Sequence, residues 1–303
     1  MKYNLLQIIG RCNFLRFGLR DRIIRAFDNP DTTEPRSFST PFFGGTYTGN
    51  MSSFIDWSVY YYGAYSIEEL NLMFDFTPKE KNGTVVDIGA NVGHHTLFAA
   101  LLSREVISFE PFSEVAEKIN LKVKENNLEN VKLHTYALGD ENSLGSYQKP
   151  ASNNRGTGSF LRSNGSKDSV PLQIKNGDFV FNKISLDRID FIKIDVEGFE
   201  EKVIKGLYKT LLKYRPVVFF EWSENERHLS VAAKVEIFPD SYIFYQFIAD
   251  VNVAMFFRKK SYALKIASRW QDGNILAVPV ERIEGSLKTI IAKKLITGEP
   301  TIN

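Results

Sequence analysis

The sequence predicts an α/β protein with a doubly wound, mostly parallel sheet of the Rossmann-like type. Three stretches predict this fold, because residues 84–102, 106–126 and 191–214 each have the pattern of a strand, a turn and a helix. Repeated units of this kind place parallel strands side by side with helices on both faces. We therefore expect polar residues at the strand ends to gather at one edge, where such sheets bind ligands.

The chain begins with a basic stretch, residues 2–27, that has the period of one or two helices. Its expected apolar faces are Leu5, Ile8, Ile9 and Cys12, and then Leu15, Leu19, Ile23 and Phe27. Its charges are Lys2, Arg11, Arg16, Arg20, Arg22 and Arg25 against Asp21, a net +5. Two interpretations stay open: a docking helix with a solvated basic face, or a basic amphipathic helix that contacts anionic lipid or a lipid-linked acceptor.

A β-hairpin is predicted over residues 37–49, after a polar linker that ends at Arg36. The following segment, residues 57–65, is dense in aromatic residues. These rings either stack on sugar rings or form part of the core. We expect residues 1–36 to be a basic helical segment with its linker, and residues 37–80 to be an extension that packs on the main domain.

The first strand–turn–helix unit lies at residues 84–102. Its strand, residues 84–88, is rich in β-branched apolar residues, as is typical of a parallel strand buried on both faces. Gly89 and Gly93 provide a tight turn, and the apolar run 96–102 predicts a helix packed on the sheet. A strand, a glycine turn and a helix amino terminus together favour a nucleotide-type binding site.

The second strand, residues 106–110, ends in Glu110. This acid follows the glycine turn at close to the ~20-residue spacing of a carboxylate that binds a ribose diol. It would repel a 2′-phosphate, which excludes NADP more firmly than NAD or S-adenosylmethionine. The turn separates these two, because Asn91 breaks the G-x-G-x-x-G pattern and Asp87 would favour an ammonium group over a pyrophosphate. The turn therefore favours S-adenosylmethionine.

Further elements follow in order. Ser113 is a predicted cap for a helix that runs to Asn126, and residues 131–138 alternate as a third strand. Asp140, just after this strand, either accepts a hydrogen bond from an adenine amino group or only caps a turn. Residues 141–182 are rich in Ser, Asn and Gly around 153–159, which predicts inserted β-hairpins and a loop. That insertion is either a lid over the site or a surface loop.

The fourth strand lies within residues 191–195 and is followed by an amphipathic helix over 199–214, with Glu200, Lys202, Lys205 and Lys209 facing solvent. A fifth strand is predicted over 216–222. Strands are also expected over 242–248, 251–257 and 274–280, with a closing helix over 286–296. These boundaries give a main domain of residues 81–285 and a carboxyl-terminal helix and tail of residues 286–303.

Four stretches, taken together, resemble the FkbM family of methyltransferases: VVDIGANVGHHTL (85–97), SFEP (108–111), FIKIDVEGFE (191–200) and PVVFFE (216–221). The resemblance covers roughly residues 38–225. It implies the class I methyltransferase fold, whose last strand is antiparallel, S-adenosylmethionine as cofactor, and methylation mostly of hydroxyl oxygens, including those of polyketides and sugars. The family's glycine–aromatic–Glu ending of the segment before the core is absent, since Ser66 follows Gly63-Ala64-Tyr65. The expected cofactor-binding residues are Asp87, Gly89, Asn91, Gly93, Glu110, Pro111, Asp140 and Asp195.

A base is expected near the methyl group, because an alkyl hydroxyl is a poor nucleophile. The candidates are Asp195, Glu197, Glu221, His94 and His95. Two close carboxylates would raise the pKa of one of them toward neutrality. Alternatively Asp195, Glu197 and Glu221 hold Mg²⁺ or Ca²⁺, which we do not favour, or Asp195 binds the cofactor's amino group while Glu197 orders the turn. The histidines are general bases or pack against the cofactor.

Composition narrows the remaining classes. The 303 residues carry a net charge of only +2, which argues against a nucleic-acid partner. Asp195-Val196-Glu197-Gly198 also stands where N-methylating enzymes show an Asn/Asp-Pro-Pro-aromatic tetrad. One cysteine and the lack of a ~18-residue apolar run suggest a cytoplasmic protein, with membrane-peripheral contact through residues 1–27 as the alternative. We expect an O-methyltransferase that acts on a small molecule or glycan; a cofactor-binding scaffold and an NAD-dependent oxidoreductase are the rivals.

Overall fold

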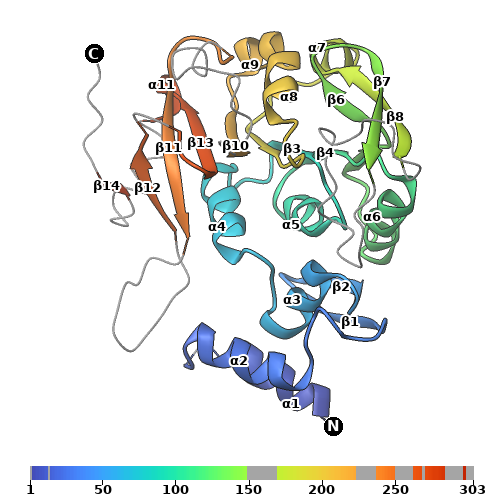
Figure 1. The fold of residues 1–303 in the computed structure, drawn as a ribbon. Coiled ribbons are helices and arrows are strands. Elements are labelled where there is room, and N and C mark those ends of the chain that lie inside the picture. Colours follow the sequence, from blue (N-terminus) through green and yellow to red (C-terminus); the bar gives the residue numbers. More distant parts are fainter. Residues whose placement is uncertain are drawn as a thin grey trace.

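The computed structural model describes residues 2–12, 14–148, 169–222, 237–249, 262–267, 270–283 and 296–297. The chain starts with an extension that lies beside the main domain (Figure 1). Its elements are α1 (Lys2–Arg11), α2 (Phe17–Phe27), β1 (Ser37–Phe42), β2 (Gly45–Asn50), α3 (Phe54–Tyr62) and α4 (Ile67–Phe76). The predicted hairpin is confirmed, because β1 and β2 pair antiparallel from Ser37↔Asn50 to Phe42↔Gly45.

The main domain holds the large sheet and the helices around it. Its first half contains β3 (Thr84–Ile88), α5 (His94–Leu102), β4 (Glu105–Phe109), α6 (Ser113–Glu125), β5 (Val131–His134), β6 (Ala137–Gly139), β7 (Ser143–Gln148), β8 (Ser169–Asn176) and α7 (Gly177–Phe181). Its second half contains β9 (Phe191–Ile194), α8 (Glu200–Gly206), α9 (Tyr208–Tyr214), β10 (Val217–Trp222), β11 (Tyr242–Ala249), β12 (Tyr262–Ile266), β13 (Gly273–Pro279), α11 (Val280–Arg282) and β14 (Ile296–Thr297).

The large sheet confirms the predicted fold class. Its strand order is β14-β12-β11-β13-β10-β9-β3-β4-β5 (Figure 1). The strands from β5 to β10 are parallel, whereas β13 pairs antiparallel with both β10 and β11. Five parallel strands, with the antiparallel strand β13 inserted between β10 and β11, form the predicted Rossmann-like sheet, and β12 and β14 extend it beyond β11. The predicted antiparallel strand, residues 274–280, is therefore confirmed as β13.

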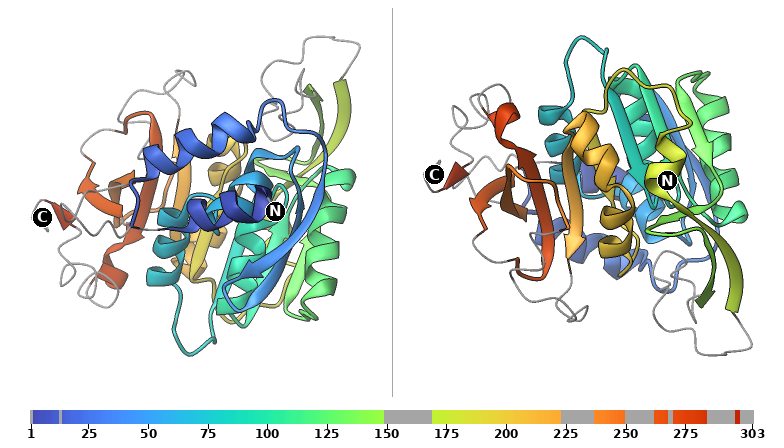
Figure 2. Two further views of the ribbon diagram at one scale, coloured as in Figure 1. Left: turned by 90° about the horizontal axis from the view of Figure 1, so that it is seen from below. Right: turned by 90° about the horizontal axis from the view of Figure 1, so that it is seen from above.

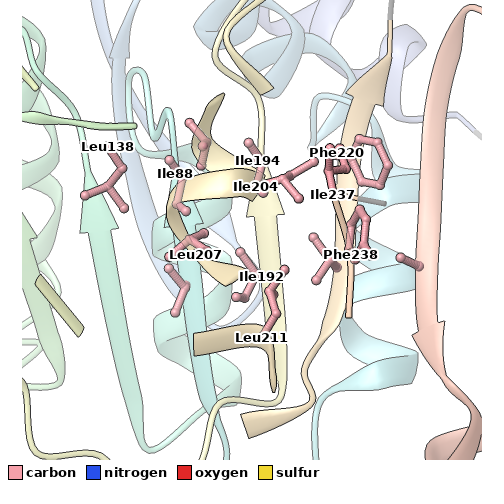
Figure 3. Close-up of a cluster of buried hydrophobic side chains, with 14 of the residues drawn as sticks. Ile88, Leu138, Ile192, Ile194, Ile204, Leu207, Leu211, Phe220, Ile237 and Phe238 are labelled. Carbon is pink, nitrogen blue, oxygen red and sulfur yellow. The ribbon is translucent and has the colours of Figure 1, made fainter. Parts of the chain in front are cut away.

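Two apolar layers enclose the sheet, and neighbouring residues of one strand serve opposite layers. Val86 of β3 packs with α8 and α9 in the layer shown in Figure 3, where Ile204, Leu207 and Leu211 face Ile192 and Ile194. Val85 packs on the other side with α4, α5 and the hairpin. All five positions of β3 are buried, as the β-branched run predicts.

The predicted apolar faces of the two N-terminal helices are only partly correct, because Ile9, Cys12, Leu15 and Ile23 are partly buried and the other four predicted residues are exposed. The helices bury Leu6, Gly10, Arg20 and Ile24, whereas Leu5, Ile8, Leu19 and Phe27 are exposed. Leu6 and Ile24 instead join Met51, Trp57 and Tyr61 in a separate cluster. Amphipathic periodicity alone did not identify the buried faces, because more than one face of these helices carries apolar residues. The contact with α3 decides which face is buried.

Other boundaries differ from the prediction. The expected strand over 131–138 is split into β5, in the large sheet, and β6, which pairs with β8 in a smaller sheet ordered β6-β8-β7. The expected helix over 199–214 is interrupted at Leu207, directly after Gly206, a residue with low helix propensity. Ser113 is the first helical residue of α6, and Phe112 occupies the cap position.

The insertion contains the predicted hairpin, formed by β7 and β8, while residues 153–159 lie outside the described part of the chain. The strand expected over 251–257 and almost all of the helix expected over 286–296 also lie outside it. The strand β12 has no counterpart in the prediction. No helix among the described residues is long and apolar enough to cross a membrane.

Candidate active site

The glycine turn after β3 is as tight as its sequence predicts. Gly89, Asn91 and Gly93 all have positive φ angles, of 81°, 50° and 83°. A Cβ atom on Gly89 would lie only 1.8 Å from the backbone oxygen of Asp195, so this turn touches the end of β9 directly. The Gly89 and Ala90 N–H groups both donate to the Phe109 oxygen, which fixes the turn on β4 as well. The turn thus joins three neighbouring strand ends.

Glu110 lies beside this turn and is buried, with 5% of its surface exposed. One carboxylate oxygen accepts a hydrogen bond from the Asn91 N–H at 2.8 Å, and the other accepts one from the Phe112 N–H at 3.1 Å. Burial raises the pKa of Glu110 to about 7; the two N–H donors oppose this shift and Asp87 adds to it. Each oxygen keeps a lone pair for a further donor.

Asp87 is fully buried in the middle of the sheet. Its Oδ2 atom accepts a hydrogen bond from the Thr96 hydroxyl at 2.6 Å, and its Oδ1 atom has no partner among the described residues. Lys193 is its register partner on β9. An unpartnered buried carboxylate oxygen is a feature that a cationic ligand group would satisfy.

Lys193 was not singled out from the sequence, yet it is the buried cation of the site, with 3% exposed. Its ammonium lies 2.9 Å from the Oδ2 atom of Asp195. Burial opposes the charge of Lys193, but Asp195, Asp87 and Glu69 outweigh burial and raise its pKa. In turn, burial acts to raise the pKa of Asp195, but Lys193 outweighs it and the pKa is lowered. Asp195 is therefore a paired, ionised carboxylate and a weak base.

Glu197 has the opposite character. Its φ angle is +54°, a left-handed conformation that costs a non-glycine residue about 1–2 kcal/mol. Burial, together with the carboxylates of Asp195 and Glu221 and against Lys193, raises the pKa of Glu197 to about 7. A strained residue with a near-neutral pKa at the carboxyl edge of a parallel sheet is typical of a catalytic acid or base.

Glu200 holds this strained turn in place. Its two carboxylate oxygens accept hydrogen bonds from the N–H groups of Val196, at 2.9 Å, and Gly198, at 3.0 Å. The prediction that Glu200 faces solvent is wrong, because only 2% of its surface is exposed. Helical periodicity placed it outward, whereas it is the first residue of α8 and bonds back to the preceding turn.

Glu221 is the penultimate residue of the next strand, β10, and its side chain is exposed. Partial desolvation and the carboxylate of Asp195 raise its pKa. Asp195, Glu197 and Glu221 thus influence one another electrostatically. Among the residues that the structure describes, however, no three His, Cys, Asp or Glu side chains are arranged to hold a metal ion.

The two predicted histidines begin α5 and are both buried. The Nε2 atom of His94 accepts a hydrogen bond from the Tyr65 N–H at 3.2 Å. Burial, with His95, Lys193 and Lys122, lowers the pKa of His94 well below its usual value. Because its acceptor nitrogen is already engaged, this geometry favours packing over proton transfer for His94.

His95 contacts Glu69, a residue that the sequence analysis did not assign to the site. Its Nε2 atom lies 3.1 Å from one carboxylate oxygen of Glu69, and the other carboxylate oxygen accepts a hydrogen bond from the Asn274 side-chain amide at 3.2 Å. The sequence held a signal for Glu69. The family's Glu after Tyr65 is absent, and Glu69 in α4 is an acid four residues after Tyr65. Glu69 connects the extension with α5 and β13.

The aromatic segment before α4 is largely core. Trp57 and Tyr61 are completely buried, while Tyr65 is partly buried and contacts His94. Burial, followed by Glu69 and Asp195, raises the pKa of Tyr65. Of the predicted residues, Asp140 is exposed after β6, and Pro111 is partly buried between Glu110 and Phe112.

Comparison with known proteins adds a family to this geometry. The model of the "Methyltransferase FkbM domain" family matches residues 87–240, which is half of the chain. No curated protein matches the sequence. Similar solved structures include methyltransferase FkbM from Methylobacillus flagellatus, with 16% identity and a TM-score of 0.41 over 65% of this chain and 44% of that one. This chain therefore spans less than half of the length of that protein.

Two further structures are similar at this level. A tRNA (uracil-54, C5)-methyltransferase from Pyrococcus abyssi, solved with S-adenosyl-L-homocysteine, has 11% identity and a TM-score of 0.41, covering 80% of this chain and 43% of that one. A precorrin-6y C5,15-methyltransferase from Geobacter metallireducens has 13% identity and a TM-score of 0.38, covering 69% and 87%.

The sheet order, the glycine turn and the matched domain together give the fold of a class I methyltransferase domain. The chain belongs to the FkbM methyltransferase family. Its residues fit the cofactor, because Glu110 offers free lone pairs beside the turn and Asp87 offers an unpartnered oxygen. The alternative of an NAD-dependent oxidoreductase is not supported by the family match.

Proposed function

We propose that this protein transfers a methyl group from S-adenosylmethionine to a hydroxyl oxygen of a small molecule or glycan, with a sugar hydroxyl preferred over a polyketide hydroxyl. The observation that carries the proposal is Glu197, a half-buried carboxyl group with a pKa of about 7 at the carboxyl end of β9. About half of a group with this pKa is ionised, and so able to accept a proton, at pH 7. General-base catalysis of this kind contributes about 10²–10⁴-fold.

In the proposed reaction the chain's main task is to position the hydroxyl and remove its proton. The cofactor, when bound, supplies a methyl group on a positively charged sulfur. Glu197 would accept the proton of the hydroxyl while the hydroxyl oxygen bonds to the methyl carbon; the bond between that carbon and sulfur would break and leave an uncharged thioether. Glu200 positions Glu197 through the Val196 and Gly198 N–H groups. Positioning lowers such a barrier by several kcal/mol.

The proposed cofactor residues surround the turn. Glu110 would accept hydrogen bonds from the ribose hydroxyls, and Asp87 would attract the ammonium group of the methionine part. Asp195, already paired with Lys193, would order the edge of the sheet next to Asp87 and Glu110. Gly89, Asn91, Gly93 and Pro111 would shape the turn, and Asp140 would meet the adenine.

The charge of the site supports a neutral, hydroxyl-rich acceptor. Glu69, Glu197 and Glu221 influence the same edge, and Lys193 is the buried cation that opposes them. Carboxylates accept hydrogen bonds from paired hydroxyls and repel phosphates. This disfavours nucleic acids and phosphorylated acceptors. The preference for a sugar therefore rests on the carboxylates, because Trp57 and Tyr61 are buried and cannot stack on a ligand.

The test is methyl transfer from isotope-labelled S-adenosylmethionine to a panel of neutral glycans, polyketide alcohols and RNA, with mass spectrometry of the products. We expect methyl ethers of a hydroxyl-bearing acceptor, and at least a 100-fold lower rate for Glu197→Gln with unchanged S-adenosylhomocysteine binding. Glu129→Gln, at an exposed glutamate outside the site, is the matched control. Methylated RNA, or an unchanged rate for Glu197→Gln, would contradict the proposal.

A further inference from the structure

The helices α1 and α2 form a fixed layer on the outside of the extension. Figure 2 shows them at the surface when the molecule is seen from below. The Lys2 ammonium donates to the Phe27 oxygen, and the Arg20 guanidinium donates to the Gly10 oxygen at 2.5 Å, so the two helices run antiparallel. A Cβ atom on Gly10 would lie 2.4 Å from the Tyr61 oxygen, which shows how closely α1 rests on α3.

The two helices and the turn between them expose large apolar side chains. The most exposed are Leu5 (60%), Ile8 (67%), Phe14 (78%), Leu19 (48%) and Phe27 (60%), which we call the N-terminal apolar surface. Large apolar side chains that are this exposed usually occur singly on a soluble surface. Here five of them fall within one pair of helices and the turn that joins them.

The structure also separates the basic residues into two groups. Arg11 and Arg20 turn inward, to the Thr40 hydroxyl at 2.7 Å and to the Gly10 oxygen, and Arg25 pairs with Asp21 at 2.9 Å. The cations that stay exposed are Lys2, Arg16 and Arg22. The only acid of the two helices is thus neutralised, and the exposed cations accompany the apolar side chains.

We propose that the N-terminal apolar surface docks on an anionic lipid bilayer, with α1 and α2 lying in the plane of the interface. Leu5, Ile8, Phe14, Leu19 and Phe27 enter the boundary between headgroups and acyl chains, while Lys2, Arg16 and Arg22 contact lipid phosphates. Apolar area and cationic charge together are the two signals that stable interfacial binding requires.

The charge selects lipid over a second copy of the chain as the occupant. An isologous dimer through this surface would bring the same cations against each other across the interface, and like charges facing each other are unfavourable. An anionic bilayer instead attracts every exposed cation of the surface.

The same extension supplies Tyr65 and Glu69 to the candidate active site. Docking through α1 and α2 would therefore hold that site near the bilayer surface. The proposal does not depend on the identity of the acceptor or on catalysis, and its test needs neither.

The test is co-sedimentation of the full chain with vesicles of phosphatidylcholine alone, or mixed with phosphatidylglycerol. We expect binding to the mixed vesicles, reduced at least tenfold in the triple variant Ile8→Ser/Phe14→Ser/Leu19→Ser. The matched control is Leu121→Ser/Leu144→Ser/Leu212→Ser, which removes equally exposed residues elsewhere (51%, 80% and 57%) and should bind like the unaltered chain.

A second pair of variants tests the charges. Arg16→Gln/Arg22→Gln should lower binding to the anionic vesicles several-fold, and Lys124→Gln/Lys209→Gln should not. Circular dichroism confirms folding, and the single variants Ile8→Ser and Phe14→Ser replace the triple variant if its melting is altered. Equal binding of the apolar variant and its control would overturn the proposal. So would a dimer that this variant dissociates, or the absence of sedimentation with anionic vesicles.

Discussion

The ammonium of Lys193 lies 2.9 Å from the Oδ2 atom of Asp195, at the carboxyl end of β9. This ion pair gives Asp195 and Glu197, two nearby carboxylates, different protonation properties. Asp195 is held ionised by Lys193, whereas Glu197, two residues further on, has a pKa raised to about 7 by burial and by that same ionised Asp195. One strand end thus presents a fixed charge beside a group that exchanges its proton near neutral pH.

Removal of Lys193 should be strongly destabilising. Loss of one partner of a buried ion pair costs roughly 3–5 kcal/mol, and we expect about 2–3 kcal/mol because Asp195 is 42% exposed. Urea unfolding of Lys193→Met measures this loss. Lys205→Met breaks the more exposed pair with Glu201 and should cost under about 1 kcal/mol. Equal losses in both variants would show that the buried pair has no special weight.

The raised pKa of Glu110 predicts a pH-dependent stability. A carboxyl group with a folded pKa of about 7 and an ordinary value of 4.5 binds its proton more tightly in the folded state. Its stabilising effect is therefore complete below about pH 4.5 and is lost as the pH rises through 7, a change on the order of 3 kcal/mol. The difference in unfolding free energy between the unaltered chain and Glu110→Gln should follow this course. A difference that is constant from pH 4.5 to 8 would refute the shift.

Cofactor affinity should depend on the same group. If ribose hydroxyls donate to ionised Glu110, binding of S-adenosylhomocysteine should tighten about tenfold per pH unit below 7 and level off above it. Calorimetry at pH 5.5 to 8.5 checks this, and Glu110→Gln should bind more weakly with a flat profile. If the affinity of both proteins depended on pH in the same way, the titrating group would be a residue other than Glu110.

A methyl group at Gly89 should disrupt the turn. Gly89→Ala forces a Cβ atom to within 1.8 Å of the Asp195 oxygen, in addition to the cost of a positive φ. We expect a loss of about 3 kcal/mol or more in unfolding free energy, together with loss of cofactor binding. Gly44→Ala is the control, because Gly44 has a φ of +90° and open space around it. We expect this variant to lose only about 1–2 kcal/mol of unfolding free energy. Similar losses for the two variants would mean that the close approach is unimportant.

The comparison of sequence and structure separates local signals from tertiary ones. The β-branched strand at 84–88 and the turn at Gly89 are encoded locally, so their pattern predicted them correctly. The roles of Lys193 and Glu69 depend on which strands and helices become neighbours in the fold. The local periodicity of the sequence carries no information on these neighbours. Glu200 shows the limit of periodicity, because a helix amino terminus bonds to the turn before it.

The buried face of α1 in the extension also depends on a tertiary contact. Both faces of α1 carry apolar residues, and the contact of Gly10 with α3 decides which face is buried. The sequence predicted the hairpin and the two-helix start of the chain, but the exposed apolar side became visible only once α3 was in place.

The most direct test of the proposed mechanism is the pH profile of methyl transfer by the unaltered chain and by Glu197→Gln. With Glu197 as the base, kcat/KM for the acceptor, measured with S-adenosylmethionine saturating at every pH, should rise with pH and level off above an apparent pKa near 7. Glu197→Gln should be slower by about 10²–10⁴-fold and lack that rise, with unchanged S-adenosylhomocysteine affinity. A variant that keeps both the rate and the pH profile would contradict the assignment of Glu197 as the base.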